Sequence, residues 1–399
     1  MKREQITVLI SSLIVVCIFY AVHYVTRSRA EEMDRIRVGF VYDGDESTTF
    51  TANFMRAQYA MEAEYGDRVE VEVMSNVPDN DAEDALRQLV RKNCDIIFTN
   101  SAAYSEISRQ IAEEYPEIEI CQATGTNAAD GPDNYHTFMG AIHEGRYLTG
   151  IVAGLKIREM IDQRKITPEE AVVGYIAAYP YAEVISGYTA FLLGVRKIVP
   201  EAVMKVVYTY TWSDYKLEKE YAEFLIGEGC VFISQHSDTA GPAEACEELY
   251  PDRVVYHVGY NQSMLTIAPT TSVISSRINW EPYIKGAVGA LLSGQKIEEA
   301  FSCNVWGNDT GGGIKDGWVE LLELNSFIAA EGTEEVLEEE TQLIRAGEAQ
   351  IFFGDYTGTA PDDPGDTVDL REEFSECSIQ SAPAFGYVLD DVIEVVEVS

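Results

Sequence analysis

Several polar groups able to bind a ligand follow an apolar, strand-like run near the middle of the sequence. The stretch CVFISQHSD begins with four apolar residues and turns polar at Gln235, His236 and Asp238. One explanation is trivial, because strands end in loops and loops are polar. The other is that in α/β proteins the loops after the carboxyl ends of strands bind ligands. The rest of the sequence has to decide between the two.

The same pattern recurs at the ends of other expected strands, where aromatic rings alternate with amides and carboxylates. Rings supply flat apolar faces, and Asn, Gln and Asp fix a hydrogen-bonding edge, so the set suits a flat polar ligand. The carboxyl ends of parallel strands face one crevice, and we expect these side chains to line it. They are Asp43, Phe50, Asn100, Ser101, Tyr181, Trp212, His236, Asp238, Tyr260 and Asn261.

Each of these residues also has an ordinary structural explanation. A tryptophan near a strand end, such as Trp212, is often a core or lobe-interface residue, and Asp43 can serve its own turn. Taken alone, His236 is more typical of a surface or capping histidine. Asp214 can cap the helix expected from Tyr215. The prediction of a binding site therefore rests on the whole set.

Signatures of catalysis and of metal binding are missing from the sequence. It has no GxxxxGK[ST] phosphate loop, no GxSxG nucleophile elbow and no HExxH motif. The five histidines show no ligand spacing, and the seven cysteines include no CxxC pair. The glycine-rich stretch from Gly307 is expected to be a loop, and a disulfide between Cys303 and Cys377 is conceivable outside the cell. The sequence predicts a protein that is not an enzyme and holds no metal or other cofactor.

Length and charge narrow the class of protein further. At 399 residues the chain exceeds what one hydrophobic core usually serves, about 250–300 residues, so two lobes are expected. The chain has 29 Lys and Arg against 67 Asp and Glu, a formal charge of -38. Such a surface repels phosphate backbones, which excludes nucleic acid as a partner.

Residues 1–30 differ from everything that follows. Two basic residues precede an apolar stretch, Ile6 to Val25, close to the roughly 20 residues that cross a bilayer. This favours an uncleaved transmembrane anchor whose positive end stays inside, with the main body on the extracellular face of the cell membrane. Cleavage after Ala30 and lipidation of Cys17 are the alternative interpretations.

From Arg37 onward, short apolar strand-like runs alternate with helical patterns of about 10–15 residues. Two such series predict two doubly wound, Rossmann-like α/β lobes with parallel sheets. The order becomes less regular later, as expected if the chain crosses back between lobes. We expect a first lobe at 36–142 with a return segment at about 266–325, and a second lobe at 143–265 with a C-terminal segment at about 326–399.

Eight stretches occur in the order found in a known family: VGFVYDGDESTTFTANF, CDIIFTNSAAY, YHTFMGAIHEGRYLTGIVAGL, ISGYTAFLLGVRKIVPEA, VVYTYTWSD, CVFISQHSDTAGP, HVGYNQSM and SSRINWEPYIKGA. On these stretches the chain resembles the basic membrane protein family. Its members are substrate-binding proteins of ABC importers and include bacterial purine-nucleoside receptors. The resemblance implies the type I periplasmic binding protein fold, two α/β lobes joined by a hinge of crossing strands, with the ligand between them.

The resemblance also implies how the ligand is held. Similar members stack nucleosides or purine bases between aromatic rings, so Phe50 is expected on one side and Trp212 or Tyr181 on the other. Asn261 stands where many members carry an aspartate that grips ribose, and the lysine that many carry near SSRIN is missing.

Asn279 and Trp280, together with the QHSD loop, resemble a subgroup thought to take free bases. They complete the expected set of ligand-binding residues. The resemblance therefore implies a purine-like ligand without specifying the sugar.

The implied function is the extracellular binding of a purine base, nucleoside or similar flat heterocycle, which is passed to an ABC permease. The expected state is a monomer attached to the membrane through its N-terminal helix. A ligand-sensing ectodomain of the same fold is the alternative. Hydrolysis of a nucleoside is a third hypothesis, for which Asp43 or Asp238 could act as the base.

Overall fold

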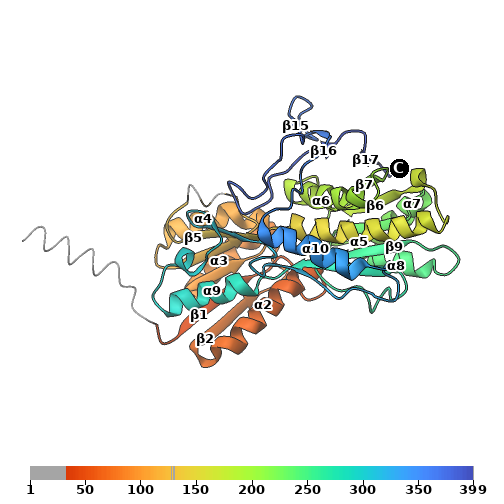
Figure 1. Ribbon diagram of the computed structural model, residues 1–399. Helices are drawn as coiled ribbons and strands as arrows, with labels where there is room; N and C mark the ends of the chain where they lie inside the picture. Colours follow the sequence, from red (N-terminus) through yellow and green to blue (C-terminus); the bar gives the residue numbers. More distant parts are fainter. Residues whose placement is uncertain (1–32, 127, 129–130, 399) are drawn as a thin grey trace, which may run out of the picture.

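The computed structural model describes residues 33–126, 128 and 131–398, and the expected anchor at 1–30 lies outside them. Among the described residues, no helix is both long enough and apolar enough to cross a membrane. The described chain forms two α/β lobes side by side (Figure 1).

The first lobe contains a seven-stranded sheet in the order β11-β12-β5-β4-β3-β1-β2. Its pairs are parallel except for the edge pair of β11 and β12. The strands are β1 (Ile36–Val41), β2 (Val69–Met74), β3 (Ile96–Thr99), β4 (Glu119–Ala123), β5 (Tyr135–Gly140), β11 (Asn304–Trp306) and β12 (Asp309–Gly312).

Helices cover both faces of this sheet, because successive side chains of a strand point to opposite faces. Val38 and Phe40 of β1 pack in the core beneath helices α2 and α9, whereas Ile97 of β3 and Ile120 of β4 pack beneath α3 and α4. The four helices are α2 (Thr49–Tyr65), α3 (Ala82–Arg91), α4 (Ser105–Glu114) and α9 (Glu281–Leu292).

The second lobe repeats this plan with a seven-stranded sheet in the order β13-β10-β9-β8-β6-β7-β17. Helices α5, α6 and α10 lie on one face, and α7 and α8 on the other (Figure 1). The strands are β6 (Val172–Ala177), β7 (Val203–Tyr208), β8 (Phe232–His236), β9 (Tyr256–Tyr260), β10 (Ser272–Ile278), β13 (Val319–Leu321) and β17 (Ile393–Val395). The helices are α5 (Ile142–Asp162), α6 (Ala182–Ile198), α7 (Tyr215–Gly227), α8 (Gly241–Glu248) and α10 (Thr333–Ala346).

Helices α5 and α6 touch through their backbones. A Cβ atom on Gly150 would lie 2.1 Å from the carbonyl oxygen of Phe191, and one on Gly194 would lie 2.1 Å from that of Tyr147. Only glycine allows so close an approach. The beginning of α5 also packs on the second sheet, where a Cβ atom on Gly145 would lie 2.8 Å from the side chain of Val319 in β13.

The chain crosses between the lobes more often than the sequence predicts. The segment expected to return to the first lobe, about 266–325, is shared between the lobes: β10 and β13 belong to the second sheet, whereas α9, β11 and β12 lie with the first. The loop expected from Gly307 is wrong in part, since it contains strand β12, which pairs with β5.

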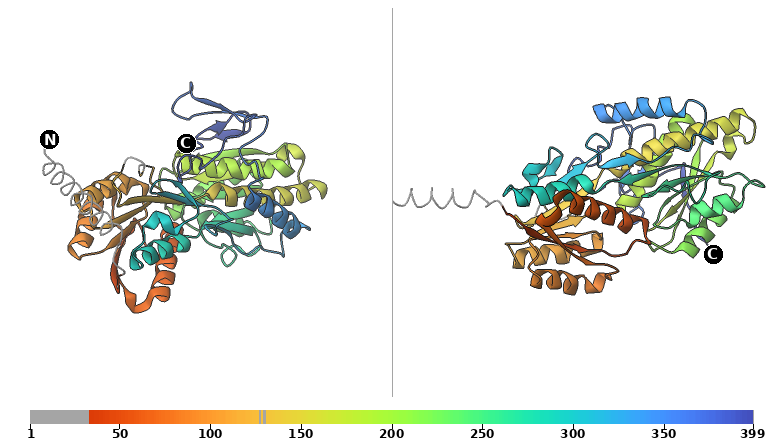
Figure 2. Two further views of the ribbon diagram at one scale, coloured as in Figure 1. Left: turned by 60° about the vertical axis from the view of Figure 1, so that its left-hand side comes forward. Right: turned by 90° about the horizontal axis from the view of Figure 1, so that it is seen from below.

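The C-terminal segment lies with the second lobe. Strand β17 pairs with β7, and Phe385 is buried in the core that also contains α5 and α6. A small third sheet, β15-β14-β16, projects from this side of the molecule (Figure 2). Its strands are β14 (Thr357–Thr359), β15 (Thr367–Asp369) and β16 (Val388–Leu389).

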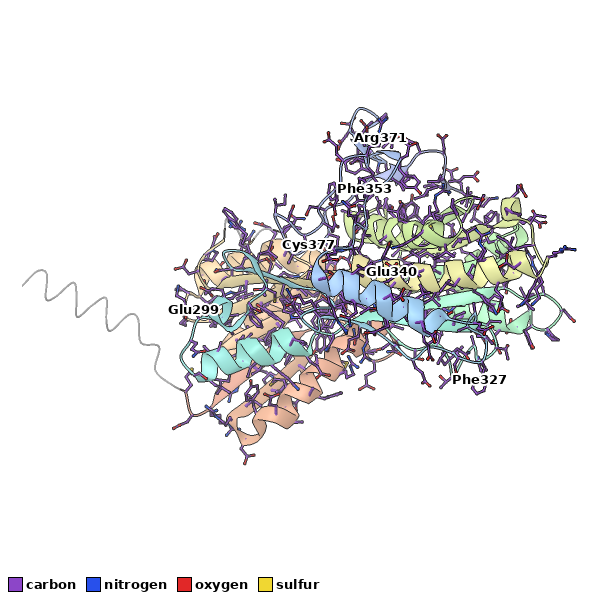
Figure 3. The ribbon with its side chains drawn as sticks, viewed as in Figure 1. Glu299, Phe327, Glu340, Phe353, Arg371 and Cys377 are labelled. Carbon is purple, nitrogen blue, oxygen red and sulfur yellow. The ribbon has the colours of Figure 1, made fainter. Side chains whose placement is uncertain are left out.

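The six described cysteines are free thiols. The conceivable disulfide between Cys303 and Cys377 is therefore not formed. Cys377 lies where the two lobes meet (Figure 3), and its thiol donates to the backbone oxygen of Ser381 at 3.4 Å. Cys94, Cys121 and Cys230 are buried, as the sequence predicts.

Candidate functional site

A cavity of about 810 Å³ lies between the lobes, at the carboxyl ends of strands from both sheets. Its volume falls within the range typical of small-molecule sites. The residues that line it are Asp43, Gly44, Thr48, Phe50, Val77, Pro78, Asp79, Asn100, Ser101, Ala102, Ala103, Thr124, Tyr179, Tyr181, Glu183, Thr211, Trp212, Ser213, His236, Asp238, Tyr260 and Asn261.

The structure brings ten of the twelve residues predicted for the site to this cavity. They follow β1, β3, β6, β7, β8 and β9, as expected for neighbouring parallel strands. The two that do not line the cavity are Asn279 and Trp280.

The first-lobe wall is a closed hydrogen-bond network around Asp43. The hydroxyl of Thr51 and the side-chain amide of Asn100 donate to one carboxylate oxygen of Asp43, at 3.0 and 2.9 Å. The backbone N–H of Asp43 donates in return to the side-chain oxygen of Asn100 at 2.9 Å. Burial raises the pKa of Asp43, and these hydrogen bonds oppose that rise because they favour the charged form.

Phe50 presents a half-buried ring from the first turn of α2. Trp280 is fully buried behind it. Its ring stacks on Phe54 with centroids 4.2 Å apart and meets the Phe50 ring edge-on at 5.9 Å. Trp280, predicted as a ligand contact, does not line the cavity, because its position at the start of α9 places it in the first-lobe core, where it supports Phe50 from behind.

Asn279 is also predicted as a ligand contact, but its side chain hydrogen-bonds to other parts of the chain outside the cavity. Its side-chain amide donates to the carbonyl of Gly317 and to the carboxylate of Glu320, both at 3.0 Å, and its oxygen accepts from the N–H of Glu281 at 3.2 Å. All its polar atoms are engaged. Asn279 thus joins crossing segments of the chain outside the cavity.

Aromatic rings dominate the second-lobe wall. Tyr179 and Tyr181 stack with centroids 5.1 Å apart and planes 10° apart, and Trp212 lies 5.4 Å from Tyr179. His236 continues the row, 6.5 Å from Trp212 and 4.6 Å from Tyr260. Tyr181 remains about half exposed. The wall offers ring faces against which a flat ligand can stack.

Three residues on this wall carry buried polar atoms that have no partner among the described residues. They are Nδ1 of His236, the hydroxyl of Tyr260 and both side-chain atoms of Asn261, and these residues are 2%, 2% and 1% exposed. Asn261 has a φ of 63°, a left-handed conformation that Asn tolerates better than most residues, and this turn follows β9 directly. Buried polar atoms are nearly always hydrogen-bonded, so these atoms beside the cavity are candidate partners for a ligand.

His236 lies beside Glu183, which begins α6. The Nε2 atom of His236 is 3.6 Å from a carboxylate oxygen of Glu183, and a Cβ on Gly187 would lie 2.9 Å from its Nδ1 atom. Burial lowers the pKa of His236, and the neighbouring Glu183 opposes that shift. The imidazole is therefore a neutral, tightly packed part of the wall.

Asp238 connects the lobes. The hydroxyl of Thr49 donates to its carboxylate at 3.1 Å, and the N–H of Thr49 donates to its backbone oxygen at 3.1 Å. Burial, together with the negative charges of Asp43 and Glu218, raises the pKa of Asp238 well above its usual range. The carboxyl group thus lines the cavity and also holds the lobes together.

Gln235, which the sequence groups with His236 and Asp238, does not reach the cavity. Its amide donates to the backbone oxygens of Ser237 and Thr239 at 3.0 and 2.8 Å, and its oxygen pairs with Nε2 of His257 at 3.1 Å. It organises the turn after β8.

The ionisable carboxyl groups that line the cavity are not balanced by any Lys or Arg side chain among the described lining residues. The acidic lining residues are Asp43, Asp79, Glu183 and Asp238. A phosphorylated or carboxylated ligand would meet like charge, whereas a ligand rich in N–H or O–H donors would find acceptors. No group of three or more His, Cys, Asp or Glu within the described residues is arranged to hold a metal ion.

The sequence reasoning missed Glu183 and Arg146. Glu183 lies two residues after Tyr181, in the first turn of α6. The sequence signal for it is an acidic residue directly after an expected strand end. Arg146 is fully buried in α5, next to the cavity wall, and its only signal is a cation in the largely apolar first part of the helix.

Comparisons with known proteins agree with this geometry. Residues 36–350 match the family described as ABC transporter substrate-binding protein PnrA-like. The chain is 27% identical over 327 residues to a purine-binding protein of Brucella abortus, which covers 82% of this chain and 85% of that protein. It is 30% identical over 299 residues to a protein of Haloferax volcanii named as an ABC transporter glucose-binding protein, which covers 75% of this chain and 69% of the relative.

Solved structures support the same fold. An ABC transporter solute-binding protein from Aeropyrum pernix superposes with a TM-score of 0.65 at 18% identity, covering 78% of this chain and 92% of that one. A solute-binding protein from Conexibacter woesei gives a TM-score of 0.59 at 16% identity, covering 79% and 97%. These likenesses confirm the predicted periplasmic binding protein fold. The chain belongs to the Bmp family of PnrA-like ABC transporter substrate-binding proteins, which bind solutes and are not enzymes.

Proposed function

We propose that this protein binds a purine base or nucleoside, or a similar flat heterocycle, between its lobes and delivers it to an ABC permease. The observation that carries the proposal is the pair of unpartnered residues, Tyr260 and Asn261, beside a wall of aromatic rings. A purine presents ring faces for Phe50 and the second-lobe rings, and donors and acceptors around its edge for the amide.

The charge of the cavity further defines the ligand. Four acidic side chains, and the lack of a Lys or Arg among the described lining residues, favour an uncharged ligand that donates hydrogen bonds. Purine N–H and amino groups and ribose hydroxyls are such donors. A nucleoside 5′-monophosphate is expected to be rejected, because its phosphate would be buried without a cation.

A sugar is the second candidate. The Haloferax volcanii relative is named for glucose, and carboxylates and amides beside aromatic rings also suit sugar hydroxyls. The purine is favoured because the Brucella abortus relative, which matches over more of both chains, is named for purine, and because several rings from one lobe line the cavity.

Thermal unfolding in the presence of candidate ligands tests the proposal. A ligand that binds the folded state stabilises it by about 2.7 kcal/mol at one hundred times its Kd. The panel is adenine, guanine, hypoxanthine, adenosine, guanosine, riboflavin, glucose and adenosine 5′-monophosphate. We expect a higher Tm with at least one purine base or nucleoside and no change with the monophosphate. Stabilisation by glucose alone would favour the sugar, and no stabilisation by any of them would refute the proposal.

The cellular setting is part of the proposal. The apolar segment at residues 6–25 supports attachment of a monomer to the extracellular face of the membrane, where closure of the lobes would present the cargo to the permease. A ligand-sensing ectodomain would use the same cavity. Copurification of a permease with the full chain distinguishes the two, because only a transport component requires it.

A further inference from the structure

The residue that stands out beside the cavity is Arg146, in the second turn of α5. Its side chain is fully buried, yet no Asp or Glu forms an ion pair with it among the residues that the structure describes. An unpaired buried cation costs several kcal/mol unless other groups compensate it. The burial of this cation without an ion pair therefore has to be explained by the groups around it.

The guanidinium connects the ends of three neighbouring strands. Its Nη2 atom donates to the hydroxyl of Tyr175 on β6, and to the hydroxyl of Ser234 and the backbone oxygen of Gln235 on β8, the last two at 3.1 and 2.8 Å. Its Nη1 atom donates to the backbone oxygen of Gly259 on β9 at 3.4 Å. In β8 and β9, the residue that follows each contacted carbonyl, His236 or Tyr260, lines the cavity.

The charge of Arg146 is placed behind the ligand wall. Its guanidinium carbon lies 5.0 Å from the centre of the Tyr260 ring, 5.3 Å from that of Tyr175 and 5.7 Å from that of Phe191. Cations over aromatic faces are attracted by the ring quadrupole, more strongly when desolvated. The same charge opposes protonation of His236, which Glu183 favours from the other side.

We propose that Arg146 is the positioning residue of the ligand site, tying the ends of β6, β8 and β9 together beneath His236 and Tyr260. The proposal rests on the proposed function, since it takes the cavity as the ligand site. The ligand then meets a wall whose rings are held in place and whose imidazole is uncharged.

Substitution of Arg146 tests this directly, with Lys156 as a matched control. Lys156 lies on the same helix, is buried, and places its ammonium 4.8 Å from the ring of Tyr256 at the start of β9. The probe is the tightest-binding member of the purine panel, measured by isothermal titration calorimetry. We expect Arg146→Met to weaken binding at least about 10-fold and Lys156→Met to weaken it less than about 2-fold.

A second measurement separates positioning from loss of structure. The groups that face His236 are Glu183 from α6, Arg146 from α5, Tyr260 from β9 and Trp212 from the loop after β7. Without the Arg146 charge His236 protonates at a higher pH, so Arg146→Met should lose affinity more steeply than wild type between pH 7 and pH 5. That extra loss should disappear in the double variant with His236→Gln, and Arg146→Lys, which keeps the charge, should not show it.

If Arg146→Met folds too poorly for titration, Tyr175→Phe replaces it, because this change removes only a hydroxyl acceptor of the guanidinium. We expect about 3-fold weaker binding from it. If wild type binds, Arg146→Met with unchanged affinity and pH dependence, or Tyr175→Phe with unchanged affinity where it replaces Arg146→Met, would overturn the role of Arg146 alone. Absence of binding by wild type would overturn the proposed function and the inference with it.

Discussion

The two walls of the cavity use their polar groups in opposite ways. On the first-lobe wall, Asp43, Thr51 and Asn100 hydrogen-bond to one another. On the second-lobe wall, Tyr260 and Asn261 have buried polar atoms with no partner among the described residues. A satisfied network has little to gain from a ligand, whereas an unsatisfied group gains a hydrogen bond that it lacks. If the cavity binds the proposed ligand, the second lobe is therefore expected to recognise its polar edge, and the first lobe to supply a ring face and a fixed carboxylate.

The two walls also differ in the residues that pack behind them: apolar rings behind the first-lobe wall and a buried polar network behind the second-lobe wall. Phe50 rests on an apolar cluster that contains Phe54 and Trp280. His236 and Tyr260 rest on the buried polar network of Arg146. Apolar packing tolerates small shifts at modest cost, whereas a hydrogen-bonded guanidinium fixes positions and directions. Precision is thus concentrated where hydrogen bonds to the ligand are made.

Replacing Trp280 and Trp212 should give the largest difference between the two regions, in stability and in ligand affinity. Trp280→Ala removes a fully buried ring from the first-lobe core and should lower the free energy of unfolding by about 3–5 kcal/mol, measured by chemical denaturation. Trp212→Ala, on the cavity wall, should lower it by less than about 2 kcal/mol but weaken ligand binding about 10-fold. Equal stability losses in the two variants would contradict the assignment of Trp280 to the core.

The two asparagines provide the next contrast. Asn261→Gly removes the unpartnered amide and keeps a residue that accepts a positive φ, so it should weaken binding by about 2 kcal/mol with little loss of stability. Asn100→Ala breaks the network around Asp43 and should cost about 1–3 kcal/mol of stability. Calorimetric titration and chemical denaturation of both variants measure these effects. A larger loss of affinity in Asn100→Ala would reverse the roles of the walls.

The two aspartates should differ in their pH dependence. The pKa of Asp238 is raised well above its usual range by burial and by Asp43 and Glu218, so the folded protein keeps this proton as the unfolded chain releases it. The contribution of Asp238 to stability should then fall as pH rises from about 4 through its folded pKa. Asp238→Asn should remove part of that fall, gaining on the order of 1 kcal/mol at pH 8 and nothing near pH 4. Asp43→Asn should gain less, since hydrogen bonds from Thr51 and Asn100 already stabilise the charged Asp43.

Denaturation curves at pH 4, 6 and 8 measure this difference. The contact of Asp238 with Thr49 should survive in Asp238→Asn, because the amide oxygen still accepts from the hydroxyl. An Asp238→Asn variant that gains no stability over wild type between pH 4 and pH 8 would contradict the account.

Much of the fold and of the cavity lining can be predicted from the sequence, because both follow from local patterns. Alternating strands and helices specify doubly wound lobes. Parallel strand ends meet at one edge of each sheet, and the two edges face the same cavity, which brings Asp43, Asn100 and His236 together. Trp280 could not be placed in this way. It follows β10 of the second sheet but begins α9, which packs on the first sheet, and no local pattern reveals that crossing.

Other differences have equally local causes. Gln235 and His236 are neighbours at one strand end, and only the tertiary structure shows that the partners of Gln235 are the turn and His257, whereas His236 lines the cavity. The strand β12 is short and glycine-rich, so its pairing with β5 is a tertiary effect that propensity does not predict. Arg146 depends on three strands that follow it in sequence, so its environment is invisible from the helix alone.

Isothermal titration of the purine panel into wild type and Asn261→Gly, with Asn100→Ala in parallel, tests the central claim most directly. The account predicts that wild type binds at least one purine base or nucleoside, and that Asn261→Gly weakens this binding about 30-fold and Asn100→Ala much less. Purine binding that is unchanged in Asn261→Gly, or no purine binding by wild type, would contradict it.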